Sequence, residues 1–260
     1  MTIKASGLMF RYGPRPVLAG VTLSVGGQGL TALCGPNGAG KSTLLHVMAG
    51  RLKAQVGQVE LDGRPIADLT APARARRIAV VPQALGATFD LAVEDLVTLG
   101  RLHRLGMRDR LLLRPLSPAD ESAVQAALDA MDIAALRSRR LSQISGGEQA
   151  RAMIATALAQ GADHLLLDEP TAHLDPAFRR EILEILSRLA QDGRTVLIVL
   201  HDLMLAGLYA DRVALLADGR IAASGEAGQV LTSETLSQVF RTPLRVERHP
   251  ASGRPLVLPG

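Results

Sequence analysis

One glycine-rich stretch limits the fold of this chain more than any other feature: Gly35-Pro36-Asn37-Gly38-Ala39-Gly40-Lys41-Ser42. It has the pattern G-x-x-x-x-G-K-[ST], whose glycines let backbone N–H groups converge on a phosphate. Residues 30–34 predict a buried strand before the stretch, and residues 41–49, with Thr43 in the first turn, predict a helix after it. The positive end of that helix points at the same anion, so we expect a phosphate-binding loop.

Within this loop, Lys41 is expected to reach the β/γ-phosphates of a nucleotide and Ser42 to ligate Mg²⁺. Lysine is rare in the chain, since Lys4, Lys41 and Lys53 are the only three and the other basic residues are arginines. The alternative is a glycine-rich turn with an accidental Lys-Ser pair. The predicted strand and helix around the stretch disfavour that alternative.

The remaining pattern predicts an α/β fold. Residues 78–81, 165–167, 196–200 and 213–217 are apolar without alternation, which is typical of strands covered on both faces, and 213–217 is expected to be the last core strand. A helix at 177–190 between two of them indicates a parallel crossover. Residues 1–30 and 56–61 predict short strands. From 93 to about 158 the pattern is helical, with amphipathic segments at 93–102 and 119–131 separated by the arginine-rich stretch 101–114.

Composition narrows the classes of protein. The chain has 260 residues and is 47% hydrophobic, enough for one large α/β domain or a core with a subdomain. The formal charge is +4, yet aromatic residues, which single-strand binders use for stacking, make up only 2%, so no nucleic-acid partner is expected.

Cys34 is the single cysteine, which excludes an intrachain disulfide. Neither a signal peptide nor an apolar run of about 18 residues is recognisable, so we expect a soluble chain that reaches a membrane through a partner.

Two acidic residues stand at the tip of a predicted strand. The apolar run 165–167 is followed directly by Asp168 and Glu169. Asp168 would hold the Mg²⁺ shell, and Glu169 would act as the general base toward an attacking water. Solvated acids at an ordinary strand end are the alternative, which loses force beside a phosphate loop.

A second glycine-containing motif opens a helix. Ser145 has the properties of an N-cap, Gly146 and Gly147 follow it, and the helical pattern continues from Glu148 to Gly161. Two glycines at a helix start expose N–H groups to an anion. A plain capped helix is the alternative interpretation of Ser-Gly-Gly by itself.

These residues resemble the signature L-S-G-G-Q of ABC transporters. Together with the phosphate loop and Asp168-Glu169, they make the chain resemble the ATPase subunit of such a transporter over almost its whole length. Ile144 replaces the family's Leu, and Glu148 replaces its Gln. The resemblance implies a phosphate-loop NTPase core with a small antiparallel β subdomain, at 1–87 and 159–240. It also implies an inserted helical signature subdomain at 88–158 and a short C-terminal tail at 241–260.

The resemblance assigns further positions. Tyr12 would stack on adenine, and Gln83 would touch Mg²⁺ or the lytic water. Asp175 matches a loop at the contact between subunits, and His201 matches a histidine that contacts the γ-phosphate and positions water. A core Tyr and a structural His are the alternatives for Tyr12 and His201. The role of His173, where a small residue is usual, is open.

The family also implies partners. ATP and Mg²⁺ would bind between two copies of the chain in a head-to-tail homodimer, where Ser145, Gly146, Gly147 and Glu148 of one copy cap the nucleotide on Lys41 of the other. Hydrolysis would drive an integral membrane permease, served by a substrate-binding protein, with this subunit peripheral on the cytoplasmic face of the inner membrane. The helical insertion would dock onto the permease.

The C-terminal segments 225–240 and 249–255 resemble the ending of ATPases that serve importers of iron-siderophores, haem and cobalamin. We therefore expect an importer of an iron chelate, haem or a ferric siderophore, in preference to cobalamin. A soluble ABC-type ATPase of translation or DNA repair is the alternative, but tandem cassettes and long coiled coils are not recognisable here. A phosphate-loop kinase or GTPase is disfavoured by the signature at Ser145 and by His201.

Overall fold

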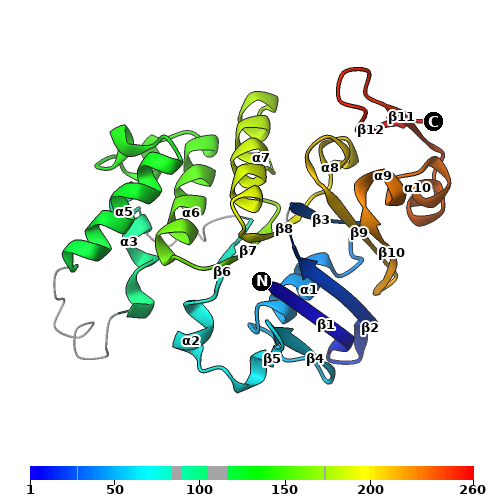
Figure 1. Ribbon diagram of the computed structural model, residues 1–260, viewed down its shortest axis with the longest axis horizontal. Coiled ribbons are helices and arrows are strands. Elements are labelled where there is room, and N and C mark those ends of the chain that lie inside the picture. Colours follow the sequence, from blue (N-terminus) through cyan, green and yellow to red (C-terminus); the bar gives the residue numbers. More distant parts are fainter. Residues whose placement is uncertain (28, 84–89, 105–115, 173) are drawn as a thin grey trace.

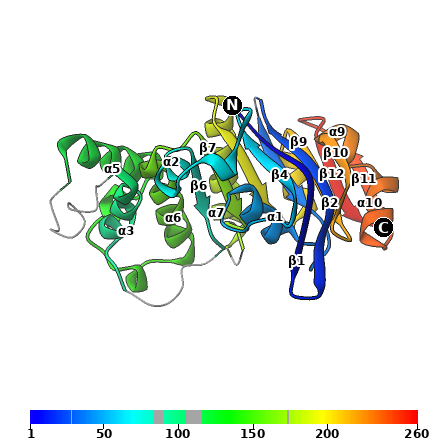
Figure 2. The same cartoon turned by 90° about the horizontal axis from the view of Figure 1, so that it is seen from below.

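A computed structural model of the chain describes residues 1–27, 29–83, 90–104, 116–172 and 174–260. Figure 1 shows the helices α3, α5 and α6 gathered at one end of the molecule and the C-terminal elements at the other, with the sheets between them, and Figure 2 gives the same order from below. The α-helices are α1 (Lys41–Met48), α2 (Ala71–Ala75), α3 (Val93–Leu99), α5 (Pro118–Ala130), α6 (Gly146–Gln160), α7 (Pro176–Gln191), α8 (Leu203–Tyr209), α9 (Ala227–Val230) and α10 (Ser233–Phe240).

The central sheet has the strand order β10-β9-β3-β8-β7-β6. Its strands are β3 (Leu30–Cys34), β6 (Ile78–Val81), β7 (His164–Asp168), β8 (Thr195–Val199), β9 (Arg212–Ala217) and β10 (Arg220–Glu226). All neighbouring pairs are parallel except β9 with β10. The predicted parallel α/β core is therefore confirmed.

Both faces of this sheet are buried, which explains why its strands are apolar without alternation. In β7, Leu165 and Leu167 join a core that includes residues of α5, α6 and α7, whereas Leu166 joins a second core with residues of α1, β1 and β2. In β8, Ile198 belongs to the first core and Leu197 to the second. Successive side chains on a strand point to opposite faces, so each strand supplies both cores.

A second, antiparallel sheet has the order β2-β1-β4-β5. Its strands are β1 (Thr2–Tyr12), β2 (Arg15–Gly26), β4 (Val56–Leu61) and β5 (Arg64–Pro65). β1 and β2 have 11 and 12 residues, longer than the short strands expected from the sequence. This sheet and the helical group fit the predicted fold class, which is confirmed. The exact boundaries at 88 and 158 stay a prediction, and α6 continues to Gln160.

Several features differ from the sequence-based expectation. β9 is the last strand of the central sheet with buried residues, but the sheet continues in β10, which pairs with β9 antiparallel through the turn at Asp218-Gly219. Small residues follow one another at 222–225 in β10 and give no clear strand pattern, so this half-exposed edge strand was not recognised. The tail contains a hairpin of β11 (Leu244–Arg248) and β12 (Pro255–Pro259), and the helix expected at 93–102 ends as α3 at Leu99. The arginine-rich stretch 101–114 lies largely outside the described residues.

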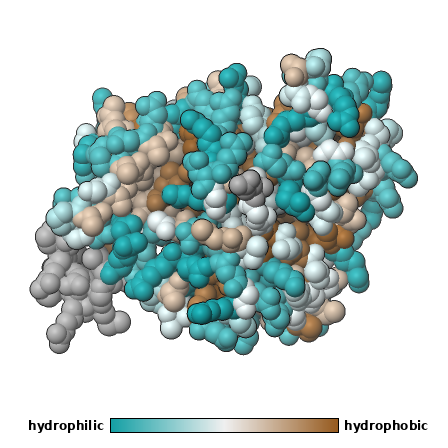
Figure 3. All heavy atoms as spheres, viewed as in Figure 1, coloured by the Kyte–Doolittle hydropathy of each residue, from teal (hydrophilic) through white to brown (hydrophobic). Residues whose placement is uncertain are grey.

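The surface is mixed in character. The face shown in Figure 3 is mostly hydrophilic, with smaller hydrophobic patches between the elements. Among the described residues, every helix is too short or too polar to cross a bilayer.

Candidate functional site

The glycine-rich loop connects β3 to α1 as predicted, and its glycines are needed for close packing and for backbone shape. A Cβ built on Gly35 would lie 1.9 Å from the carbonyl oxygen of Leu216 in β9, so a side chain there is excluded. Gly38 and Gly40 have φ angles of 76° and 102°, a left-handed region that other residues rarely adopt. Gly40 stands at the N-cap of α1, so the positive end of that helix opens onto the loop.

Lys41 lies across its own loop. Its side chain is buried, and Nζ donates hydrogen bonds to the carbonyl oxygens of Gly35 at 2.8 Å and Pro36 at 3.0 Å. Burial lowers the pKa of Lys41 from its ordinary value, while the nearby Glu169 opposes that shift. A buried ammonium that is held by neutral carbonyl oxygens alone gains strongly from an anion. The loop and Lys41 therefore fit the phosphate group of a nucleotide.

Ser42 and Asp168 meet although 126 residues separate them. The Ser42 hydroxyl donates to Oδ1 of Asp168 at 3.0 Å, because α1 starts beside the end of β7. Burial raises the pKa of Asp168, and the charge of Glu169 adds to the effect, while the bond from Ser42 opposes it. A hydroxyl and a buried carboxylate at this distance are oxygen ligands of the kind that Mg²⁺ prefers. The donor set fits the ion.

Glu169 lies between the two other predicted catalytic residues. Nε2 of Gln83 donates to its Oε2 at 3.1 Å, and Nε2 of His201 contacts its Oε1. Gln83 follows β6 and His201 follows β8, so the order β8-β7-β6 delivers all three side chains to one edge of the sheet. Glu169 has a φ angle of 50°, an uncommon backbone conformation for a residue with a side chain. The geometry leaves its carboxylate held from both sides.

A cavity of about 560 Å³ contains most of the predicted residues. Tyr12 and Thr43 line it, together with Asn37, Gly38, Gly40, Lys41, Ser42, Gln83, Glu169 and His201. Tyr12 is 53% exposed, and its ring stands edge-on to that of Phe10, with 4.9 Å between ring centroids. A flat, exposed aromatic ring at the rim of a phosphate site is suited to stacking on a base. Gly35, Pro36 and Ala39 belong to the loop but do not line the cavity.

Sequence reasoning missed two lining residues, Arg15 and Val17. They stand on β2, which pairs with β1 so that Arg15 lies opposite Tyr12. The Gly13-Pro14 turn between two strands was the available signal, since a hairpin places the residues on its two sides next to each other.

The signature residues do not line this cavity among the described residues. Ser145 is the N-cap of α6, as predicted: its Oγ accepts from the Glu148 N–H at 3.3 Å. In return, Oε2 of Glu148 accepts from the Ser145 N–H at 2.7 Å and from its hydroxyl at 2.8 Å. These reciprocal bonds form a capping box, which Gln at this position could also make. Glu148 thus has a structural role that the sequence left open.

The signature helix rests on the start of α7. A Cβ on Gly147 would lie 2.8 Å from the ring of Phe178, so only glycine permits this contact. A Cβ on Gly146 would be 3.8 Å from Leu174, an ordinary distance. Asp175 is the N-cap of α7, with Oδ1 accepting from the Phe178 N–H at 3.1 Å, and its side chain is exposed outside the nucleotide cavity. His173 lies outside the described residues.

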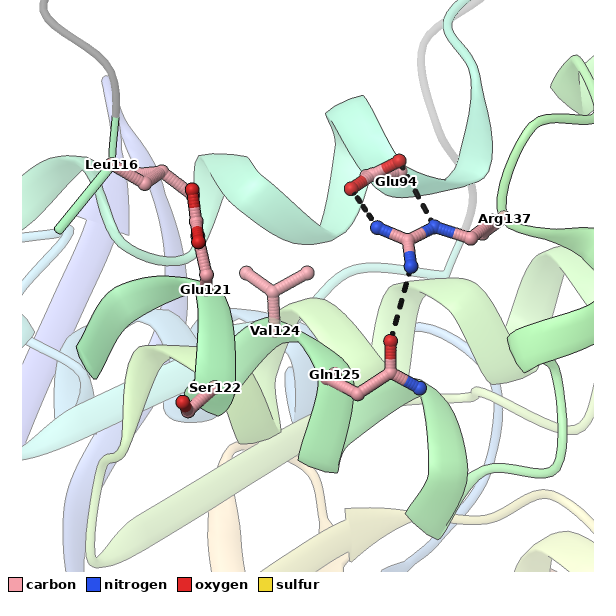
Figure 4. A pocket seen from close by; sticks show the side chains of 7 residues that line it. All are labelled: Glu94, Leu116, Glu121, Ser122, Val124, Gln125 and Arg137. Carbon is pink, nitrogen blue, oxygen red and sulfur yellow. Dashed lines mark hydrogen bonds and ion pairs between the residues drawn. The ribbon is translucent and has the colours of Figure 1, made fainter. Parts of the chain in front are cut away.

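Another cavity, of about 550 Å³, lies within the helical group and contains none of the predicted site residues. Its lining consists of Glu94, Leu116, Glu121, Ser122, Val124, Gln125 and Arg137. Figure 4 shows Arg137 reaching across it to Glu94 of α3 and Gln125 of α5. Because α3 and α5 each contribute one wall, this cavity belongs to the helical unit and not to the nucleotide site.

The chain is similar to known proteins of one family. A family model described as ABC transporter matches residues 18–172. The hemin import ATP-binding protein HmuV of Streptomyces coelicolor is 46% identical over 255 residues, which are 98% of this chain and 89% of that protein. A structure described as an inward-facing metal-chelate type ABC transporter has a TM-score of 0.85 at 27% identity and covers 100% of this chain and 97% of its own.

A further solved structure bears on assembly. It is an ATP-binding cassette in a dimeric, post-hydrolysis state with bound ADP and phosphate. Its TM-score is 0.72 at 26% identity, with 86% of this chain and 98% of that chain covered. That cassette and this chain are similar over their nucleotide-binding fold.

Proposed function

The chain belongs to the ABC transporter family, and from that premise we propose that it is the ATP-hydrolysing subunit of an importer of haem or a related iron chelate. The observation that carries the enzymatic part is the joint position of Lys41, Glu169 and His201 on one cavity. The cargo is supported by the 46% identity to a hemin import ATP-binding protein and by the likeness to a metal-chelate transporter. Ferric siderophores and cobalamin are the alternative cargoes of the proposed importer, and haem is favoured over both.

The reaction is the attack of water on the γ-phosphate of ATP. Lys41 and the N–H groups of the loop bind the phosphates, and Tyr12 stacks on the adenine. Glu169 accepts the proton of the attacking water, because its carboxylate is the group held in place by Gln83 and His201. His201 orients the water and stabilises the charge that develops on the γ-phosphate. Positioning and charge stabilisation account for most of the catalysis in this class of reaction.

Mg²⁺ is part of the proposal. Ser42 and Asp168, with Gln83 nearby, would hold it, and it would supply charge neutralisation for the phosphates. A cation held there would also offset the cost of ionising Asp168 in a buried place.

Two copies of the chain act together. ABC ATPases work as dimers, and we propose that Ser145, Gly146, Gly147 and Glu148 of one copy close over the nucleotide bound by the other, with Asp175 at the contact between subunits. Ser145 and Gly146 are exposed, and the nucleotide cavity of the same chain is lined without them. An exposed helix N-terminus, where the helix dipole is positive, is suited to receive a phosphate from a partner copy.

A membrane permease is the further partner. We propose that the helical unit at 88–158 docks onto it, with Gln83 at the hinge to the core at 1–87 and 159–240, and with 241–260 as the tail. A substrate-binding protein would act through the permease, and the chain would be peripheral on the cytoplasmic face of the inner membrane. The helical group at one end of the molecule supports such docking (Figure 1).

Growth on haem tests the cargo. Cells that lack the chromosomal copy receive the unmodified chain or Lys41→Ala, and growth is measured with haem, then with a ferric siderophore, as the sole iron source. We expect the unmodified chain to restore growth on haem and Lys41→Ala to fail to restore it. Equal growth of both strains on both iron sources would exclude the iron role.

Co-purification tests the transporter assignment. A tagged Glu169→Gln variant is extracted with mild detergent from native membranes in the presence of ATP, and the accompanying proteins are identified. An integral membrane protein with many apolar helices supports the proposal. A soluble chain that brings down ribosomes or DNA would favour the alternative ABC-type ATPase of translation or DNA repair.

A further inference from the structure

Arg179 stands in the first turn of α7 and has no part in the mechanism above. It lines a cavity of about 270 Å³ that lies beside the nucleotide cavity and shares Gln83, Glu169 and His201 with it. Arg179 and Asp202 line this second cavity only. Gln83, Glu169 and His201 therefore also border a second cavity, on the side of α7.

The first contact of Arg179 is with the chain just before its own helix. Its Nε donates to the carbonyl oxygen of Leu174 at 2.6 Å. Leu174 is buried and lies under Gly146 of the signature, while Phe178 lies under Gly147. The bond from Arg179 consequently fixes the segment on which the signature helix rests.

The second contact is with the residue that follows His201. Nη1 of Arg179 lies 4.0 Å from Oδ2 of Asp202. The other carboxylate oxygen of Asp202 caps α8, accepting from the N–H groups of Met204 at 3.0 Å and Leu205 at 3.1 Å. Asp202 is therefore held on one side by α8 and approached on the other by Arg179. Its neighbour His201 contacts Glu169 directly.

The ion pair between Arg179 and Asp202 is expected to affect catalysis more than the stability of the fold. The side chains of Arg179 and Asp202 are 35% and 37% exposed, and an ion pair at that exposure contributes little to the stability of the fold. Catalysis is more sensitive, because a displacement of about 1 Å in a reacting group can cost about 100-fold in rate. This ion pair therefore matters mainly through the geometry that it sets between the two segments it joins.

We propose that Arg179 is a positioning residue that joins the base of the signature helix to the segment carrying His201. It holds His201 against Glu169 through Asp202, and it holds Leu174 under Gly146. One guanidinium makes both contacts because its nitrogens are fixed in a plane and point in different directions. The inference rests on the proposed ATPase function.

The test compares Arg179→Gln with Arg180→Gln. Arg180 is adjacent on α7, is 69% exposed, and pairs with Glu184 away from the site, so it is the matched control. We expect Arg179→Gln to lower kcat about 10- to 100-fold. KM for ATP should change less than about twofold, since the groups that bind the nucleotide are untouched. Arg180→Gln should retain the kcat and KM of the unmodified chain.

Two further variants keep the result interpretable. Arg179→Lys supplies a charge that can reach Asp202 or Leu174 but not both, so its kcat should fall between those of the unmodified chain and Arg179→Gln. Asp202→Asn keeps an oxygen to cap α8 and removes the charge, and its effect should not add to that of Arg179→Gln. Thermal unfolding of each variant shows whether the fold is retained.

The outcomes separate the two proposals. If the unmodified chain fails to hydrolyse ATP with its permease, the proposed function is wrong. If it hydrolyses ATP and Arg179→Gln retains kcat, or raises KM with kcat unchanged, the positioning role is wrong, and a raised KM would indicate direct binding of nucleotide. Additive effects of Asp202→Asn and Arg179→Gln would equally overturn the link through Asp202.

Discussion

Nε2 of His201 contacts Oε1 of Glu169, although the two residues follow different strands and are 32 positions apart in the chain. The contact exists because β7 and β8 are adjacent and parallel, so that their carboxyl ends meet at one edge. Residues that touch in this way are expected to act as a unit in catalysis.

The pair gives the first prediction. Glu169→Gln and His201→Gln should each lower kcat by about 10²- to 10⁴-fold, because the proton acceptor or its orientation is lost. ATP binding should persist, and Glu169→Gln should accumulate as an ATP-bound dimer, visible by size-exclusion chromatography. The double variant should be little slower than the slower single variant. Wild-type turnover in Glu169→Gln would remove Glu169 from the role of base.

Asp168 is expected to support ATP hydrolysis while lowering the stability of the folded chain. Its pKa is raised above the ordinary value, so the folded chain without ligand is destabilised by the ionised carboxylate at neutral pH, while the unfolded chain is not. Asp168→Asn removes that charge and retains an oxygen for the Ser42 hydroxyl. Its melting temperature in the absence of nucleotide should rise by about 2 °C, while MgATP hydrolysis is lost. Scanning calorimetry and a phosphate-release assay measure the two effects, and a lowered melting temperature would contradict the argument.

Substitution by alanine should change the free energy of unfolding very differently at the two signature glycines. Gly147→Ala forces a Cβ against the ring of Phe178 and should cost about 1–3 kcal/mol in the free energy of unfolding. Gly146→Ala meets only an ordinary contact and should change that free energy by less than about 0.5 kcal/mol. Urea denaturation compares them. The cost of Gly147→Ala should shrink in a Phe178→Leu background, and an unchanged cost there would show that the ring is not the obstacle.

His164 should make stability depend on pH. It is fully buried at the start of β7, 3.4 Å from Asp62, and burial lowers its pKa. The unfolded chain takes up a proton on this histidine below about pH 6.5, whereas the folded chain resists it until a lower pH. The free energy of unfolding should therefore fall as the pH decreases from about 6.5 toward the lowered pKa. His164→Gln should flatten this dependence in chemical denaturation between pH 7.5 and 5, and an identical slope would refute it.

The elements with strong local signals followed from the sequence. The glycine loop, its strand and its helix were predictable because φ requirements, capping and apolar runs act between near neighbours. The same holds for Ser145 as a cap and for the two acids at the end of β7. The half-exposed β10 and the C-terminal hairpin were not predicted, because their residues are mostly small or exposed and owe their place to β9 and α8. Pro255, for example, lies so close to α8 that a Cβ on Gly207 would be 2.3 Å from its carbonyl oxygen.

What the sequence by itself determined is therefore the set of chemical groups and the local backbone that presents each one: the phosphate loop, the two acids, the capped signature helix. Only the tertiary structure decided which of them meet. The strand order brings Gln83, Glu169 and His201 together, leaves Ser145 outside their cavity, and places Phe178 under Gly147. The physical reason is that strand pairing and close packing act between residues far apart in the chain, where no local pattern records the partner.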